Sequence, residues 1–233
     1  MNRGLFKSTK KYSAYASLRF KNRSNKRVIS NFAKKVGIVY FGYVNQHDDE
    51  HKMIRGLTVS PDHQDYNYSV GTVDGYNLSV VDRNDYNVEP DGSTKLNNWV
   101  IFAFDLQTEA PVPHFFIGAK NHDLRPFHSL FTTFPNMKEI ALETIDDYRQ
   151  DFTSRFSIFA RPAKTDEVLT IISPEISQVI SAHFWPLSIE QHDNVLYLYS
   201  TFQPVNASLL DTMLKNGLWL ASQLDKQTGP VED

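Results

Sequence analysis

The densest group of side chains that could do chemistry is His47-Asp48-Asp49-Glu50-His51, five adjacent acid–base groups or metal ligands. A zinc site of the metalloprotease type needs His-Glu-x-x-His, which places two imidazoles on one helix face beside a catalytic carboxylate. The run lacks this spacing and lies in the polar stretch 45–52, which is typical of a loop. We therefore interpret it as a solvated loop.

Two other groups of polar side chains have simpler structural explanations. His114, His122 and His128 match no metal-binding spacing, so we expect them to be structural or exposed. Glu143 with Asp146-Asp147 could form paired carboxylates for acid–base chemistry, but a charged turn before a strand is the better explanation. Neither group indicates a catalytic site.

Several enzyme classes are excluded by what the chain lacks. It contains no cysteine, so thiol nucleophiles, thiolate metal sites and disulfides are absent. It also has no Gly-x-Ser-x-Gly elbow, no phosphate-binding glycine-rich loop and no dinucleotide fingerprint. The sequence thus predicts no catalytic residue, no cofactor and no metal, although an enzyme whose site comes from residues distant in sequence stays an alternative.

Positive charge is concentrated at the N-terminus. Of the 24 Lys and Arg residues, 11 lie within 1–35, and the first acidic residue is Asp48. The remaining chain carries 24 − 11 = 13 basic against 27 acidic residues, a balance of −14. Such an arm could bind a polyanion, either nucleic acid or an anionic membrane, or it could dock on its own acidic body. The candidate anion-binding residues are Lys10, Lys11, Lys21, Arg23, Lys26 and Arg27.

The arm leads into a helix and then a strand. Apolar residues recur at helical spacing over 26–36, with Gly37 placed to end the helix, and 38–44 is rich in β-branched and aromatic residues. The longest apolar run, Val36 to Val44, is nine residues, far below the ~18 needed to cross a bilayer. The N-terminus also lacks the apolar core of a secretory signal. We therefore expect a cytoplasmic protein, which could also contact a membrane surface as a peripheral protein.

The first predicted hairpin spans 66–82. Apolar alternation places Tyr68 and Val70 on one face and Leu78 and Val80 on one face of the returning strand. Opposing these sets requires Val70 to pair with Leu78, which leaves the three-residue loop Val73-Asp74-Gly75 with Gly75 in the left-handed region.

The second predicted hairpin spans 185–200. With Asp193-Asn194 as a two-residue turn, Ile189 pairs with Leu198 and Gln191 with Leu196 on the core face. The opposite face, which we expect to be wetter but aromatic, carries Ser188, Glu190, Tyr197 and Tyr199.

The remaining elements complete an α+β pattern. The stretch 99–106 is apolar on both faces and predicts a central strand, with 112–118 as its expected partner and further short strands at 139–142 and 155–160. Thr165 is predicted to cap a short helix, and Ser173-Pro174, an N-cap followed by proline, predicts the start of a second one. The longest helix is expected over 204–226, where Gly217 predicts either a close packing contact or a break.

The order of these features resembles a known family. The residues concerned are Phe32-Ala33-x-x-x-Gly37-x-x-Tyr40, Gly71-Thr72-x-x-Gly75-Tyr76 with Val80-Val81-Asp82, Glu143-x-x-x-x-Tyr148-x-x-x-Phe152-x-x-x-Phe156, Ile172-Ser173-Pro174-Glu175-Ile176 and Ile189-Glu190-x-x-x-Asn194-x-Leu196-Tyr197. From Phe32 onward the chain is similar to bacterial uncharacterised proteins that carry the domain of unknown function 3137. The resemblance implies no established activity or site. Relatives often have transmembrane helices ahead of the domain, where this chain has the basic arm.

The sequence therefore predicts an α+β protein with an antiparallel, hairpin-rich sheet, helices packed on it and a long C-terminal helix. Residues 1–25 form the basic arm and 26–233 a single domain. The leading functional hypothesis is a non-enzymatic binding or scaffolding domain with an unidentified protein partner. The alternative is a peripheral nucleic-acid- or anionic-membrane-binding protein that acts through the arm.

Overall fold

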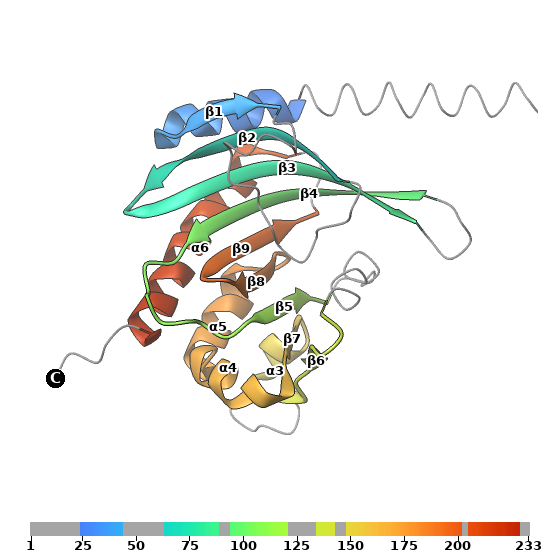
Figure 1. The fold of residues 1–233 in the computed structure, drawn as a ribbon, viewed down its shortest axis with the longest axis vertical. Helices are drawn as coiled ribbons and strands as arrows, with labels where there is room; N and C mark the ends of the chain where they lie inside the picture. The colour runs from blue at the N-terminus through green and yellow to red at the C-terminus, as the bar shows by residue number, and fades with distance from the viewer. Residues whose placement is uncertain are drawn as a thin grey trace, which may run out of the picture.

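The computed structural model describes residues 24–43, 63–88, 94–120, 134–142, 148–201 and 205–228. These residues fold around one large sheet with helices packed against it (Figure 1). The strands are β1 (Val39–Gly42), β2 (His63–Val73), β3 (Tyr76–Val88), β4 (Thr94–Asp105), β5 (Phe115–Ala119), β6 (Lys138–Glu139), β7 (Phe156–Ala160), β8 (Ser188–His192) and β9 (Val195–Ser200). The helices are a first helix over 24–36, α3 (Gln150–Thr153), the short 3-10 helix η3 (Pro162–Lys164), α4 (Thr165–Ile171), α5 (Pro174–His183) and α6 (Ala207–Thr228).

The strand order in the described sheet is β1-β2-β3-β4-β9-β8-β5-β7-β6. All pairs are antiparallel, which confirms the predicted antiparallel α+β architecture with a long C-terminal helix. Residues 1–23 of the predicted basic arm 1–25 lie outside the described residues. Within the described part, no helix is long and apolar enough to span a bilayer.

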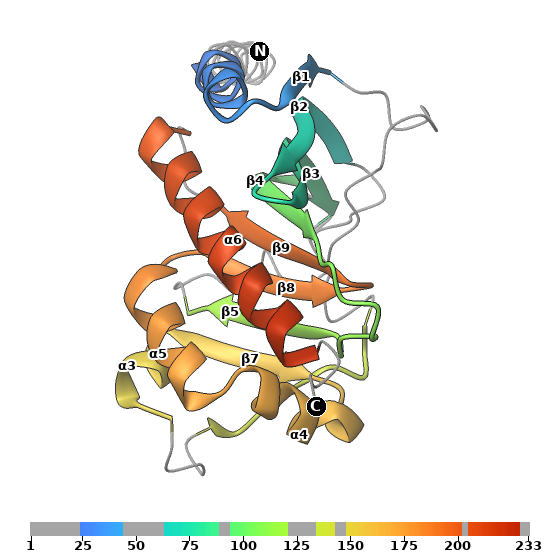
Figure 2. The ribbon, with the colours of Figure 1, turned by 90° about the vertical axis from the view of Figure 1, so that its left-hand side faces the viewer.

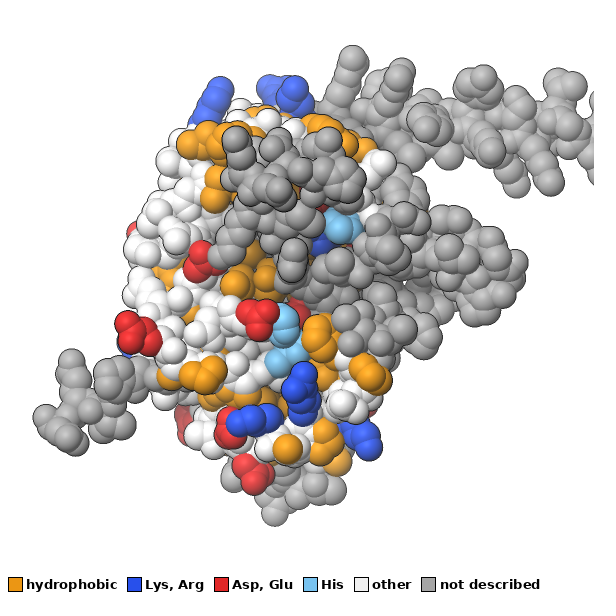
Figure 3. All heavy atoms as spheres, viewed as in Figure 1, with side chains coloured by type: hydrophobic (Ala, Val, Ile, Leu, Met, Phe, Trp, Pro, Cys, Tyr) orange, Lys and Arg blue, Asp and Glu red, His pale blue; other side chains and the backbone are white. Residues whose placement is uncertain are grey.

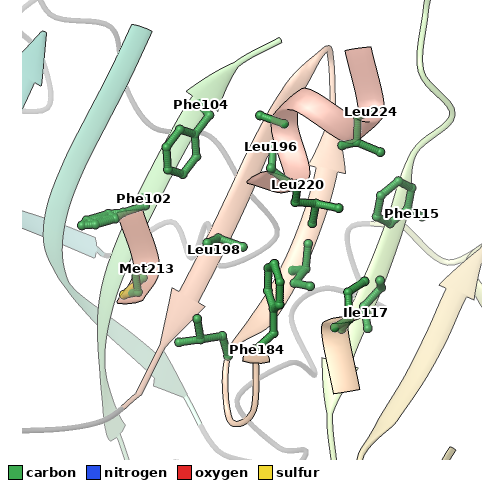
Figure 4. Close-up of a cluster of buried hydrophobic side chains, with 14 of the residues drawn as sticks. Phe102, Phe104, Phe115, Ile117, Phe184, Leu196, Leu198, Met213, Leu220 and Leu224 are labelled. Atoms are coloured by element: carbon green, nitrogen blue, oxygen red, sulfur yellow. The ribbon is translucent and has the colours of Figure 1, made fainter. Parts of the chain in front are cut away.

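Helices cover one side of the sheet, which we call the helix face (Figure 2). Apolar side chains from β4, β9 and β5 meet those of α5 and α6 there in a closely packed core (Figure 4). The labelled members are Phe102, Phe104, Phe115, Ile117, Phe184, Leu196, Leu198, Met213, Leu220 and Leu224. Burial of these residues supplies the main driving force for folding.

The opposite side of the sheet, the second face, also carries buried apolar side chains. They include Val81, Trp99, Ile101 and Tyr199 from three neighbouring strands. Strand β4 lies between β3 and β9 and contributes to both faces, which confirms the prediction of a central strand apolar on both sides.

Local signals placed most helices correctly. The helix over 24–36 ends at Gly37, whose φ is +80°, as its position predicted. The Ser173 side chain accepts a hydrogen bond from the Ile176 amide and Pro174 occupies the first turn of α5. The expected cap at Thr165 is wrong: Lys164 occupies the N-cap position of α4 and makes no side-chain cap.

Gly217 marks a close packing contact within α6. A Cβ built on Gly217 would lie 2.2 Å from both Cε2 and Cζ of Phe104. Helix α6 continues without interruption from Ala207 to Thr228, so the alternative of a helix break is not realised. The glycine lets the helix approach β4 more closely than any side chain would permit.

The predicted register of the first hairpin is wrong. Val70 pairs with Ser79 and Gly71 with Leu78, so Asp74-Gly75 is a two-residue turn with φ values of +48° and +85°. Only the left-handed conformation of Gly75 is confirmed. The argument assumed that one face of each strand is apolar, but Tyr68 packs on the second face while Leu78 packs on the helix face. Because both faces are buried, alternation alone does not fix the register.

The second hairpin has the predicted register. Ile189 pairs with Leu198 and Gln191 with Leu196 around the Asp193-Asn194 turn, in which both residues have positive φ. Its other face is dry rather than wet, because Ser188, Glu190, Tyr197 and Tyr199 are all buried.

The expected pairing of 112–118 with 99–106 is also wrong. β5 pairs with β7 and β8, and the β8–β9 hairpin lies between β4 and β5. The connection from β4 to β5 passes over the turn of the β8–β9 hairpin, and Asn194 in that turn makes hydrogen bonds to the connection. The Asn194 Oδ1 accepts from the Val112 amide at 3.0 Å and its Nδ2 donates to the carbonyls of Thr108 and Ala110. As a result β4 and β5, which are consecutive in the sequence, are not neighbours in the sheet.

Candidate functional site

A row of buried and partly buried side chains with polar groups crosses the second face of the sheet from β2 to the start of β5. Residues on this face alternate with core residues along each strand, so strand register places them side by side. The row consists of Asp65, Arg83, Trp99, Tyr199, Glu190, His114 and His192. Figure 3, which views this face, shows histidine side chains between acidic and basic ones.

One end of the row is a buried ion pair between β2 and β3. The fully buried Arg83 donates from Nε to Asp65 Oδ1 at 2.7 Å and from Nη2 to Oδ2 at 2.8 Å. Burial alone would lower the pKa of Arg83, but the hydrogen bonds and charge of Asp65 raise it above its usual value. The guanidinium is therefore held charged by two parallel hydrogen bonds.

The centre of the row is Glu190, which is fully buried on β8. The Tyr199 hydroxyl donates to Glu190 Oε2, and His114 Nε2 lies 3.2 Å from Oε1. Burial, followed by the charge of Glu190, raises the pKa of Tyr199 well above its usual value. The tyrosine therefore acts as a hydrogen-bond donor to the carboxylate.

His114 and His192 pack against each other at the other end of the row. Their ring centroids are 4.4 Å apart, and Phe134 contacts both rings edge-on. His192 Nδ1 lies 3.3 Å from Asp193 Oδ2. Burial and the neighbouring His114 lower the pKa of His192, against the opposing effect of Asp193 and Glu190. His192 is thus held neutral near pH 7.

This shift predicts how stability depends on pH. The folded state binds the His192 proton more weakly than the unfolded state does. The contribution of neutral His192 to the free energy of unfolding is therefore fully present above the usual pKa of 6.5 and is lost as the pH falls through the lower pKa of the folded state. His192→Gln should reduce this loss, since glutamine does not titrate. Urea unfolding of both proteins at several pH values between about 7 and 5 measures it. Parallel pH profiles for the two proteins would contradict the assignment to His192.

Members of the row are paired with one another across neighbouring strands. An imidazole beside a carboxylate, as in His114 and Glu190, is an arrangement that general-base catalysis also uses. The described residues contain no group of three or more His, Asp or Glu positioned to hold a metal. A buried network with paired members rigidifies the sheet on which a surface is displayed.

Exposed large hydrophobic side chains of the described structure gather at the edge of the sheet formed by β1. Among the described residues, the large hydrophobic side chains that are exposed are Val39 (57%), Phe41 (47%), Tyr43 (64%) and Trp185 (40%). Three of these four lie within 39–43. Tyr43 packs against Tyr66 with ring centroids 5.6 Å apart, and Phe41 packs against Tyr68 at 6.2 Å. Clustered apolar exposure of this kind marks an interaction site more often than a single exposed residue does.

The helix over 24–36 brings cations to the same end of the molecule. Lys26, Arg27 and Lys34 are exposed on it, and Figure 3 shows Lys and Arg side chains projecting beside hydrophobic ones at this end. We call Val39, Phe41 and Tyr43 together with Lys26, Arg27 and Lys34 the edge surface. The helix is anchored by Asn25, whose Nδ2 donates to Asp82 Oδ2 at 2.9 Å and whose Oδ1 accepts from the Val205 amide.

The sequence candidates fall in different places. Lys26 and Arg27 belong to the edge surface, whereas the other four anion-binding candidates lie outside the described residues, as do 45–52, His122, His128 and 143–147. The structure brings His114 against Glu190, 76 residues later, a contact that no sequence spacing signalled. The exposure of Val39, Phe41 and Tyr43 was also missed, because the same residues are typical of a buried strand.

Comparison with known proteins gives one likeness of fold. No protein-family model matches the chain, and a search of curated proteins finds no match. Among solved structures, the chain is similar to the crystal structure of the mycobacterial trehalose monomycolate transport factor A, TtfA, with a TM-score of 0.58 and 13% sequence identity. The match covers 91% of this chain and 99% of that one. At this identity the likeness concerns the fold alone: this chain has the overall fold of TtfA.

Proposed function

We propose that this chain is a non-enzymatic binding or scaffolding domain that contacts its partner through the edge surface. The observation that carries the proposal is the gathering of exposed Val39, Phe41 and Tyr43 along the edge strand β1 and directly after it. Edge strands in many proteins are protected by charge, by a helix or by strand pairing, whereas the exposed side chains here are hydrophobic. A rigid sheet with a buried polar row is suited to present such a surface.

A comparison of the second face of the sheet with the edge surface supports a binding role. The ionisable groups of the second face are used within the fold, whereas those of the edge surface are exposed to solvent. TtfA carries the name of a transport factor, and a non-catalytic role for this chain is compatible with a shared fold. Membership of the family with the domain of unknown function 3137 stays a prediction.

Selection of peptides from a displayed random library against the full chain tests the proposal. Peptides that bind the wild type should lose most of their affinity for Phe41→Ser/Tyr43→Ser, because these side chains supply the apolar contact area. The matched control is Trp185→Ser, which removes the remaining exposed large hydrophobic side chain of the described part.

The control variant should bind the selected peptides like the wild type. If the selected peptides bind the edge variant as tightly as the wild type, the edge surface is not the contact site. Circular dichroism of each variant confirms that the fold is retained before binding is compared.

A further inference from the structure

We propose that the edge surface takes an extended polypeptide segment rich in carboxylates, which adds to β1 as a further strand. This inference rests on the proposed function and names the chemistry of the partner.

The backbone of β1 offers the first reason. β1 is one of the two edge strands of the described sheet and pairs on one side with β2, with Val39 opposite Val70 and Tyr40 opposite Ser69. Within the described residues no strand pairs with its other side. An extended peptide can satisfy the backbone groups of such an edge by the hydrogen bonds of a sheet.

The side chains of β1 offer the second reason. Val39 and Phe41 alternate with Tyr40, whose hydroxyl donates to Asn67 Oδ1 at 2.8 Å and holds the strand on the sheet. Val39 and Phe41 therefore project from a strand that is held in place. On an added strand, every second side chain would lie on the same face and could pack against them.

Charge decides the kind of segment. Residues 24–43 contain four Lys and Arg residues and no Asp or Glu. Lys35 is paired with Asp211 at 2.7 Å, which leaves Lys26, Arg27 and Lys34 exposed without an ion pair among the described residues. A carboxylate-bearing strand is attracted to this end of the molecule, and the attraction chiefly accelerates and orients its docking.

The same charges oppose a second copy of the chain as the occupant. Pairing two β1 edges would bring two sets of exposed cations together, which is unfavourable at close range. Single-stranded nucleic acid shares the negative charge and could stack on Tyr43, but it has no backbone amide groups to pair with the strand. We therefore assign the site to polypeptide.

The shape of β1 limits the length of the occupant. The strand has four residues, and its register against β2 shifts between Tyr40 and Gly42, whose φ is +85°. Irregularities of this kind restrict uncontrolled edge pairing. The site consequently fits a short segment and not a long strand.

The test uses fluorescence anisotropy with the full chain and a labelled peptide of alternating glutamate and valine. Two control peptides have the same length: one replaces every glutamate with lysine, and the other replaces every valine with proline, which removes alternate backbone N–H groups. A labelled single-stranded DNA is titrated in parallel. Titrations at about 50 and 200 mM salt report the electrostatic part of binding.

The acidic peptide should bind at least tenfold more tightly than either control peptide and more tightly than the DNA. Lys26→Gln/Arg27→Gln/Lys34→Gln should weaken it roughly tenfold at low salt, because several exposed ion pairs are removed. Equal binding of the proline peptide, or tighter binding of the lysine peptide or the DNA, would overturn the inference.

The two proposals fail in different ways. If library peptides depend on Phe41 and Tyr43 but carry no carboxylates, the inference about charge is overturned while the edge surface remains the binding site. If the acidic peptide binds the Phe41→Ser/Tyr43→Ser variant as tightly as the wild type, strand addition at β1 is overturned.

Discussion

Replacement of Arg83 by methionine is expected to lower the free energy of unfolding by about 3–5 kcal/mol, the usual cost of removing one partner of a buried ion pair. The change leaves the Asp65 carboxylate without its two hydrogen bonds and removes the positive charge near the buried Asp85. Urea unfolding followed by circular dichroism measures the loss.

A matched control for Arg83→Met is Lys35→Met, which breaks the exposed ion pair with Asp211. Surface pairs contribute about 0–1 kcal/mol, so this variant should unfold near the wild-type midpoint. The double variant Arg83→Met/Asp65→Asn should recover part of the loss, because it removes the stranded charge. Equal effects of the Arg83 and Lys35 variants would show that the Asp65–Arg83 pair is not buried as described.

The second large effect is expected at Gly217. An alanine in an exposed helix interior stabilises by about 1 kcal/mol relative to glycine. At Gly217 the added Cβ would lie 2.2 Å from two atoms of the buried Phe104 ring, so Gly217→Ala should instead destabilise the protein. Overpacking of this kind costs about 1–3 kcal/mol, which a thermal or urea transition resolves.

Two further variants separate crowding from an effect on the helix itself. Thr212→Ala changes an exposed position on the same helix and should be neutral or slightly stabilising. In a Phe104→Leu background, Gly217→Ala should cost less than in the wild type, because the smaller side chain relieves the contact. An unchanged cost in that background would place the clash elsewhere.

Elements with strong local signals are predicted correctly from the sequence. The prediction is wrong where the pairing partner of a strand is determined by residues distant in the sequence. The helix ending at Gly37 and the N-cap at Ser173 depend on neighbours within a few positions, so they were found. The register predicted for the first hairpin is wrong because Asp74-Gly75, a pair that strongly favours a two-residue turn, decides the register against the apolar alternation. In a sheet buried on both faces, the turn chemistry is the better guide.

The candidate site is harder to predict from the sequence than the fold. The contact between His114 and Glu190 exists because the β8–β9 hairpin enters the sheet beside β5, an arrangement set by the Asn194 contacts with the 106–114 connection. The predicted pairing of 112–118 with 99–106 would have placed His114 elsewhere. Exposure at β1 likewise depends on its position at an edge of the described sheet, which composition does not reveal.

The most direct test of the central claim is hydrogen–deuterium exchange of the full chain with and without the peptide of alternating glutamate and valine. Strand addition should slow amide exchange in segments covering 38–43 and leave those around Trp185 unchanged, because the new hydrogen bonds form along β1. Unchanged exchange at 38–43 under saturating peptide, with protection elsewhere in the chain, would contradict binding at the edge surface.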